Sequence, residues 1–261
     1  MRELDDSTLI ARAGELLARA EKGEITHTHF LTPREERLLL SHFAGRREQL
    51  FSWGGYPAAE RRRIYFLPPY LADMDESLRA ECLADTLDET LCAVRVQGSG
   101  YRELSHRDFL GAILHLGVER DRIGDICVAE ANTAVLFCDR LMRSFLIESL
   151  TRVASDAVRV GAYALPNGFD GGKKFEQVSD TVPSPRADAV VAALLNLSRE
   201  RAQALFREGR VEIDYEPEER TDRPLAEGMT LSIRGYGKFT LRSLSDKTRK
   251  GRLRLLADRH I

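Results

Sequence analysis

Hydrophobic residues near the start of the chain recur every three or four positions, which is the period of an α-helix. The pattern predicts one helix over 5–21 and a second that begins after Thr32, where Pro33 takes the first helical position. The segment WGGYP at 53–57 interrupts the pattern, and a short strand after it is stopped by two prolines at 68 and 69. Residues 1–75 are therefore predicted to form an N-terminal helical region.

The middle of the chain changes to segments of alternating and helical pattern in the order β-α-β-β-α-β. These segments are LCAVRVQG, SHRDFLGAILHLG, DICVAE, TAVLFCD, RLMRSFLIESL and AVRVGAYAL. Their order predicts a ferredoxin-like sheet, with both helices on one face, over residues 76–178. The RNA-recognition module (RRM) shares this topology but displays aromatic residues on its inner strands, where this sequence offers only Phe137. We therefore expect an RRM-like scaffold rather than a surface on which bases stack.

The last third of the chain begins with a segment rich in Gly, Pro, Ser and Asp, 165–185, which predicts an extended loop and a linker. Two short helices follow, the second capped by Ser198 and ended by Gly209. Alternating strand patterns come next, in VEID and in GMTLSIRGYGKFTL. Residues 183–261 are predicted to form a third domain with a basic extension at its end.

The composition is that of a soluble globular protein, with 43% hydrophobic and 31% charged residues in 261. The net charge of −2 hides an asymmetry, because from Val182 onward 16 lysines and arginines face 12 acidic residues, against 23 and 29 before it. We expect that the charged N-terminus does not act as a signal peptide, and no apolar run is long enough to span a bilayer. The four cysteines form no C-x-x-C pair. We expect a cytoplasmic protein with buried, reduced thiols and no membrane partner.

Local signatures of catalysis are missing along the chain. The segment NGFDGGKK at 167–174 departs from a phosphate loop at both ends, and GSG at 98–100 does not continue into a dinucleotide-binding fingerprint. The six histidines form no H-E-x-x-H motif, and there is no G-x-S-x-G nucleophile elbow. We therefore expect a protein that is not an enzyme, with no catalytic residues, no cofactor and no metal.

The helix that follows Ser198 carries a polar face of particular interest. Residues spaced four, four and three apart lie on one side of it or just past its end: Arg199, Gln203, Arg207 and Arg210. The alternative is a solvated face with helical ion pairs, because Glu200 and Glu208 partly offset the cations. We expect this face to hold the backbone of a structured RNA.

The hairpin after this helix places an aromatic residue between two cations. Arg234, Tyr236 and Lys238 alternate, so the tyrosine can stack on a base while the cations contact phosphates. The alternative is a tyrosine packed on its own domain. A run of lysines and arginines from 247 to 254 continues the positive charge toward the C-terminus. These features predict a surface for a polyanion on the third domain.

Residues 185–241 resemble the S4 RNA-binding domain, a small module of two helices and a β-hairpin (alpha-L type). RAD at 186–188 matches the family's Arg-Leu-Asp, and LSRERAQALFREGRVEID matches its Leu-Ser-Arg and Gly-x-Val-x-Val signature. The resemblance adds Arg186 to the expected RNA-binding residues. The sequence departs from the family at Asp214 and Tyr215, where many members have Asn-Gly, which puts RNA contact at the hairpin tip in doubt.

The whole chain resembles the YlmH-type proteins, which have an N-terminal region, a middle RRM-like domain and a C-terminal S4 domain. RGYGKF, TRKGRLRL and the GDI at 124–126 are similar to segments of that family. The resemblance implies an α+β protein that binds ribosomal RNA (rRNA) and transfer RNA (tRNA) on the large ribosomal subunit. It also implies rescue of stalled translation in ribosome-associated quality control. We expect a monomer.

Two other functions stay open at this point. S4 domains are often attached to RNA-modifying enzymes such as pseudouridine synthases and methyltransferases, but the upstream sequence lacks the Gly-rich cofactor loop that a methyltransferase needs. Binding of S-adenosylmethionine or ATP would favour an enzyme. A division-associated interaction factor is a third candidate, and no sequence feature supports it.

Overall fold

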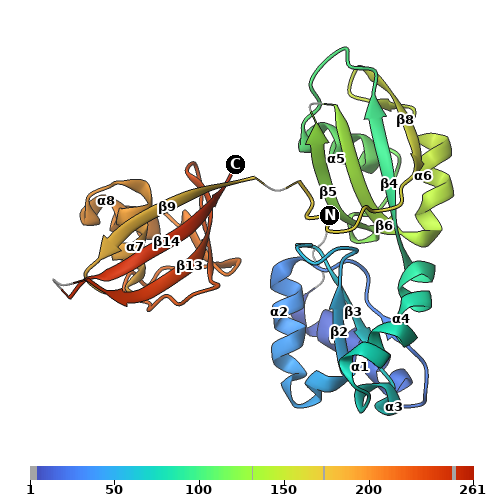
Figure 1. Ribbon diagram of the computed structural model, residues 1–261, viewed down its shortest axis with the longest axis horizontal. Helices are drawn as coiled ribbons and strands as arrows, with labels where there is room; N and C mark the ends of the chain where they lie inside the picture. The colour runs from blue at the N-terminus through green and yellow to red at the C-terminus, as the bar shows by residue number, and fades with distance from the viewer. Residues whose placement is uncertain (1–4, 131, 173, 249–250) are drawn as a thin grey trace. The chain divides into compact units, whose positions relative to one another are not determined.

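The computed structural model describes residues 5–130, 132–172, 174–248 and 251–261. The chain divides into two compact units, residues 1–172 and 173–261 (Figure 1). Helices and antiparallel sheets occur in both units, which confirms the predicted α+β class. The first two predicted regions, 1–75 and 76–178, share the first unit up to Gly172.

The N-terminal region combines helices with a small sheet. Its elements are α1 (Asp6–Ala20), β1 (Thr26–His27), α2 (Pro33–His42), the 3-10 helix η1 (Ala44–Gln49), β2 (Leu50–Trp53), β3 (Arg63–Phe66), α3 (Pro69–Ala72) and α4 (Glu76–Thr90). The predicted helices α1 and α2 are confirmed, and Thr32 caps α2 in a reciprocal capping box with Glu35. The sheet, in the order β1-β3-β2, and helix α4 were not predicted.

The middle domain has the predicted order of elements. They are β4 (Leu91–Gly98), α5 (His106–His115), η2 (Arg120–Arg122), β5 (Ile123–Glu130), β6 (Thr133–Asp139), η3 (Arg140–Met142), α6 (Arg143–Ser149), β7 (Arg152–Val153) and β8 (Asp156–Ala162). The sheet order β5-β6-β4-β8-β7 contains the ferredoxin-like arrangement, with β7 added at one edge. One face of the sheet packs its valines and leucines against Phe109 and Ile113 of α5 and Leu146 of α6.

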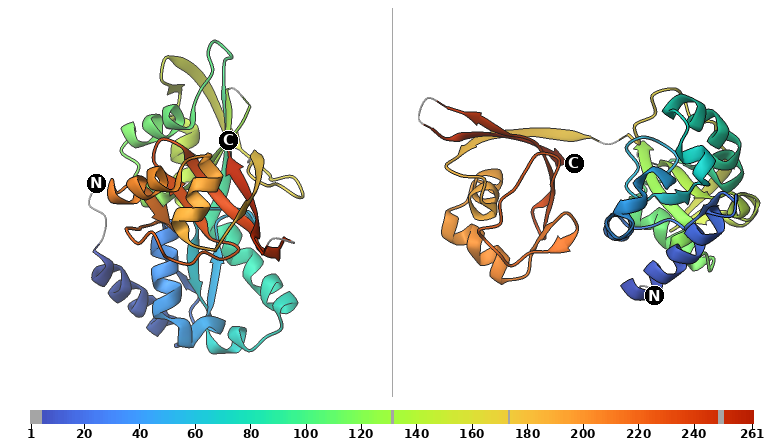
Figure 2. Two further views of the ribbon diagram at one scale, coloured as in Figure 1. Left: turned by 90° about the vertical axis from the view of Figure 1, so that its left-hand side faces the viewer. Right: turned by 90° about the horizontal axis from the view of Figure 1, so that it is seen from below.

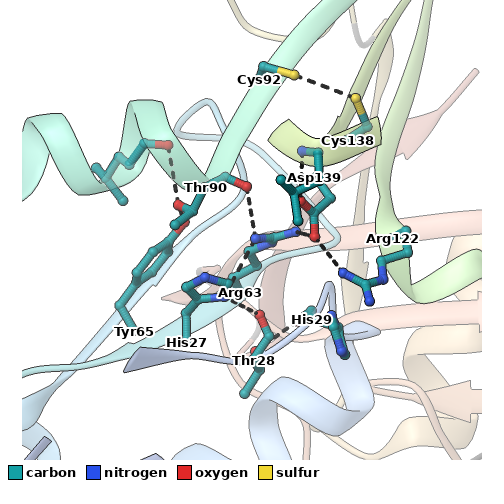
Figure 3. A network of polar contacts seen from close by, with 12 residues as sticks. His27, Thr28, His29, Arg63, Tyr65, Thr90, Cys92, Arg122, Cys138 and Asp139 are labelled. Atoms are coloured by element: carbon teal, nitrogen blue, oxygen red, sulfur yellow. Dashed lines mark hydrogen bonds and ion pairs between the residues drawn. The ribbon is translucent and has the colours of Figure 1, made fainter. Parts of the chain in front are cut away.

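A buried ion pair joins the N-terminal region to the middle domain (Figure 3). Arg63 of β3 has no exposed surface, and its guanidinium lies 3.1 Å from the carboxylate of Asp139 at the end of β6. The same guanidinium donates to the Thr90 carbonyl at 2.9 Å and lies over the ring of Phe30. Arg122 also donates to Asp139, at 2.9 Å. Hydrogen bonds and two cations therefore compensate the burial of this carboxylate.

The second unit is one curved sheet that wraps around two helices (Figure 2). Its elements are β9 (Phe175–Val182), α7 (Ala187–Leu195), α8 (Arg199–Arg207), β10 (Val211–Ile213), β11 (Glu216–Pro217), β12 (Thr230–Ile233), β13 (Gly237–Lys247) and β14 (Leu253–His260). The strand order is β11-β10-β12-β13-β14-β9. The core lies between the helices and the sheet and contains Val190, Leu205 and Phe206 together with Leu231 and Phe239.

The prediction of a loop and linker over 165–185 is wrong for its second half. Residues 175–182 form β9, which pairs along its whole length with β14 and belongs to the second unit. Only Val182 of this strand is buried, so the apolar alternation that marks a half-buried strand is absent from its sequence. Backbone pairing with β14 stabilises the strand instead, and the basic C-terminal extension supplies that partner.

The hairpin tip at which the sequence departs from Asn-Gly is a two-residue turn. Asp214 and Tyr215 connect β10 to β11, and both have positive φ, 55° and 68°. Tight two-residue hairpins require this left-handed backbone at both positions, and tyrosine adopts it at a cost. The buried Asp214 carboxylate accepts from the Thr230 backbone N–H at 2.9 Å, which fixes the turn on the neighbouring strand.

Candidate nucleic-acid interface

Asp188, in the first turn of α7, is the centre of the candidate interface. Its side chain has no exposed surface, although it carries a carboxylate. Arg199 of α8 donates to it through Nε at 3.0 Å and through Nη2 at 3.2 Å. Gln203, one turn further along α8, donates at 2.8 Å, and Arg186 donates at 3.3 Å. Three of the residues predicted to bind RNA therefore converge on one buried acid.

The ionisation of Asp188 follows from these contacts. Burial raises the pKa of the carboxyl, but hydrogen bonds from Arg199, Gln203 and Arg186 outweigh it and hold the pKa at about 2. The group is therefore negative at neutral pH, and it orients two guanidinium groups with a single charge. Arg186 and Arg199 remain 39% and 51% exposed, so their outer edges face solvent and the set carries excess positive charge.

Arg207 continues this surface by two further turns of α8 beyond Arg199. It is exposed at the end of the helix and has no hydrogen-bond or ion-pair partner among the residues that the structure describes. Ion pairs of the kind expected on a solvated helix occur at the C-terminal end of α8, where Glu208 contacts Arg201 and Arg210. Of the four residues predicted on this side of the helix, Arg199, Gln203 and Arg207 share one side of α8. Together with Arg186 they form a set that we call the α8 face.

Arg210 and Arg234 have a different environment from the α8 face. Arg210 donates to the Arg234 carbonyl at 2.6 Å, and Arg234 donates to the Gly209 carbonyl at 3.3 Å. The half-buried ring of Tyr236 packs against the domain core and has the Arg210 guanidinium 5.5 Å from its centre. These residues connect the end of α8 to the turn between β12 and β13. Packing on its own domain, the alternative weighed for Tyr236, describes its position.

Lys238 lies on β13, with its ammonium 4.9 Å from the centre of the Tyr215 ring at the hairpin tip. In the basic run, Arg252 donates to the Thr181 hydroxyl at 3.0 Å, and Arg254 is exposed. Arg249 and Lys250 lie outside the described residues. Lys238, Arg252 and Arg254 belong to the sheet and its turns rather than to the α8 face.

Sequence reasoning missed the role of Asp188. The acid was recognised as part of a motif match, but its burial and its three donors come from the packing of α7 against α8. An acid in the first turn of an otherwise apolar helix, ADAVVAALL, is a signal that could have found it, because an unpaired buried carboxylate is costly.

The cysteine prediction is correct for three residues and wrong for one. Cys92, Cys127 and Cys138 are buried thiols, whereas Cys82 is exposed on α4, where Leu83 is the buried neighbour. Within the described ranges, no cluster of three potential metal ligands is found. None of the helices in those ranges combines the length and hydrophobicity needed to cross a bilayer.

Comparisons with known proteins place the chain in a family. Residues 5–71 match the family described as "YlmH, N-terminal", and residues 90–166 match the "Putative RNA-binding domain in YlmH". The chain is 31% identical over 234 residues to the ribosome-associated protein quality control protein P2 of Bacillus subtilis (strain 168), covering 89% of this chain and 86% of that protein. The chain belongs to the YlmH family.

The YlmH family also has a solved member that is similar to this chain. The cell division protein ylmH from Streptococcus pneumoniae is 20% identical, with a TM-score of 0.47, and the match covers 63% of this chain and 94% of that one. The two YlmH family matches to the present chain, 5–71 and 90–166, both fall in its first unit.

Proposed function

We propose that this YlmH family member is an RNA-binding factor that acts on the ribosome. The observation that carries the proposal is the α8 face, on which one buried carboxylate positions two half-exposed guanidinium groups and leaves excess positive charge. Pre-oriented arginines suit phosphate oxygens because they bind them through two N–H groups at once. The Bacillus relative, named as ribosome-associated, and the family description of residues 90–166 support the same function.

In its finer form, the proposal is a cytoplasmic, monomeric and non-enzymatic factor that binds rRNA on the large subunit. Contact with tRNA and rescue of stalled translation belong to the same proposal, through the relative named for quality control. About four phosphate contacts predict that log K falls against log salt with a slope of roughly −3 to −4. The Arg186, Arg199 and Arg207 guanidinium groups supply three of these contacts.

The test is co-sedimentation of the full chain with purified large ribosomal subunits. Arg207→Glu is the informative variant, because Arg207 has no partner among the described residues, whereas Arg199→Glu would place a second carboxylate beside Asp188. We expect Arg207→Glu to lose most of the co-sedimentation while its thermal unfolding matches that of the wild type. Arg47→Glu, at an exposed position of η1, is the control with the same change of charge. Equal co-sedimentation of Arg207→Glu and wild type would contradict the assignment of the α8 face.

A further inference from the structure

The middle sheet has a second face, opposite the one that packs against α5 and α6. Cys92, Val94 and Val96 of β4 belong to the core beneath the helices. Side chains alternate along a strand, so Leu91, Ala93, Arg95 and Gln97 belong to the opposite face. In an RRM this is the face that binds RNA, and here its two halves differ.

One half of this face is closed by the chain itself. The ring of Tyr56 stacks on that of Phe137 of β6 at 5.0 Å between centres, and Phe169 packs on the edge of Tyr56 at 5.3 Å. The Tyr56 hydroxyl donates to Asp125 at 2.7 Å. Phe137 has no exposed surface, so the aromatic residue that could have stacked on a base is already stacked on a tyrosine. The WGGYP segment, 53–57, therefore supplies the tyrosine that covers Phe137.

The other half of the face carries three arginines on three adjacent strands. The pairing register places Arg95 of β4 opposite Gly161 of β8, Gln97 opposite Arg159, and Arg152 of β7 opposite Ala157. Arg95, Arg159 and Arg152 therefore share one face and follow one diagonal across β4, β8 and β7. Diagonal neighbours in such a register lie about 7–8 Å apart. We call these three residues the arginine stripe.

Within the part of the chain that the structure describes, the stripe has no counter-charge. All three arginines are exposed, and none has an ion-pair partner within the described part of the chain; Arg152 donates only to the Ser155 carbonyl, at 3.1 Å. The positions opposite the stripe in the register are filled by Gln97, Ala157 and Gly161, which are uncharged. A Cβ added at Gly161 would meet nothing within 4 Å, so the surface beside Arg95 is open. Like charges at neighbouring positions of a sheet oppose folding, and an anionic ligand would relieve that repulsion.

We propose that the arginine stripe binds the sugar–phosphate backbone of RNA, in an arrangement without base stacking because Tyr56 closes the aromatic half of the face. The inference rests on the proposed RNA-binding function and assigns a second contact surface to it, on a different unit from the α8 face. The ligand is a polyanion because three cations at regular spacing, without acids between them, match a chain of regularly spaced phosphates. Arginine provides the forked N–H groups that phosphate oxygens accept.

The test measures binding of the full chain to purified large ribosomal subunits between 50 and 300 mM salt, a range in which about three lost phosphate contacts are readily seen. The variant combines Arg95→Gln, Arg152→Gln and Arg159→Gln. We expect binding about tenfold weaker, which corresponds to about 1.4 kcal/mol, and a salt slope shallower by about 2 to 3.

The matched control combines Arg12→Gln, Arg47→Gln and Arg107→Gln, three exposed arginines of the same unit that lie on helices. It changes the net charge equally and is expected to leave both the affinity and the slope close to those of the wild type. Thermal unfolding of both variants checks that the first unit stays folded. An equal loss in stripe and control variants would mean that only net charge matters, and it would overturn the inference.

The remaining outcomes separate this inference from the proposed function. If the stripe variant binds like the wild type while Arg207→Glu does not, the stripe is not a contact surface and the proposed function stands. If the wild type does not bind, both fail. Where the wild type binds, ultraviolet crosslinking identifies the partner of the sheet face. Crosslinks from residues 90–166 to rRNA support the inference, and crosslinks only to a ribosomal protein overturn it.

Discussion

Replacing Asp188 with asparagine tests the central claim about the α8 face. The substitution keeps the size of the side chain but removes the negative charge that holds Arg186, Arg199 and Gln203. The amide N–H₂ group of asparagine is itself a donor, so it cannot accept the hydrogen bonds that these side chains donate. We expect the second unit to be destabilised and the two guanidinium groups to lose their fixed orientation.

The magnitude follows from the pKa of Asp188, which the fold lowers from 3.8 to about 2. One pKa unit corresponds to about 1.4 kcal/mol, so the ionised form contributes roughly 2 kcal/mol to the free energy of unfolding. A domain of this size loses about 4–8 °C in Tm per kcal/mol, which predicts a decrease of about 10 °C. Because the folded-state pKa is depressed, this contribution is complete above about pH 4 and is lost as the pH falls toward 2.

The assay is thermal unfolding of the full chain followed by circular dichroism, at pH 7 and at steps down to about pH 3, which spans the onset of the expected loss. At neutral pH the Tm of the wild type should exceed that of Asp188→Asn, and the difference between the two Tm values should shrink as the pH is lowered. Asp222→Asn is the control, because Asp222 forms an exposed ion pair with Arg220 and should shift Tm little. Equal Tm values for wild type and Asp188→Asn at pH 7, or a difference in Tm that does not shrink with falling pH, would refute the reasoning.

Three further substitutions test other parts of the fold by urea unfolding. Gly55→Ala, whose Cβ would meet the Phe137 ring at 2.3 Å at a φ of 102°, should destabilise the first unit by roughly 2 kcal/mol or more, and a neutral result would contradict the closed sheet face. Arg63→Met leaves the buried Asp139 with one cation fewer and should cost roughly 3 kcal/mol; a loss below about 1 kcal/mol would show that Arg122 suffices. Tyr215→Gly removes a left-handed tyrosine and should stabilise the second unit by roughly 0.5–1 kcal/mol, whereas a loss would mean that the contact with Lys238 outweighs the backbone strain.

The middle domain was predictable from sequence because its strands have strong apolar content and its helix α5 has a serine cap and a glycine end. Strand β9 and helix α4 both escaped prediction because their apolar patterning is weak. Strand β9 has little apolar signal, since backbone pairing with β14 holds it. Among the α4 side chains that the structure describes, only Leu83 is fully buried, so no clear apolar stripe marks the helix.

The candidate site was also only partly predictable from the sequence. Residue spacing correctly placed Arg199, Gln203 and Arg207 on one side of α8, because helix geometry is local. Sequence could not show that Asp188 is buried beneath them, since that depends on how α7 and α8 pack. Nor could it show that Tyr56, far away in the chain, covers Phe137.

The junction around Arg63 and Asp139 decides how the first unit can be dissected. A fragment cut at the bounds of the family match, 90–166, would leave behind Tyr56, Arg63 and the loop that carries Phe169. It would expose Phe137 to water and leave Asp139 with Arg122 but without Arg63. Such a fragment would be less stable and prone to aggregate, and any nucleic acid that bound to the uncovered Phe137 ring would do so only because of the truncation. Residues 5–172 form one compact unit, in which Tyr56, Arg63 and Phe169 stay with the sheet that they cover.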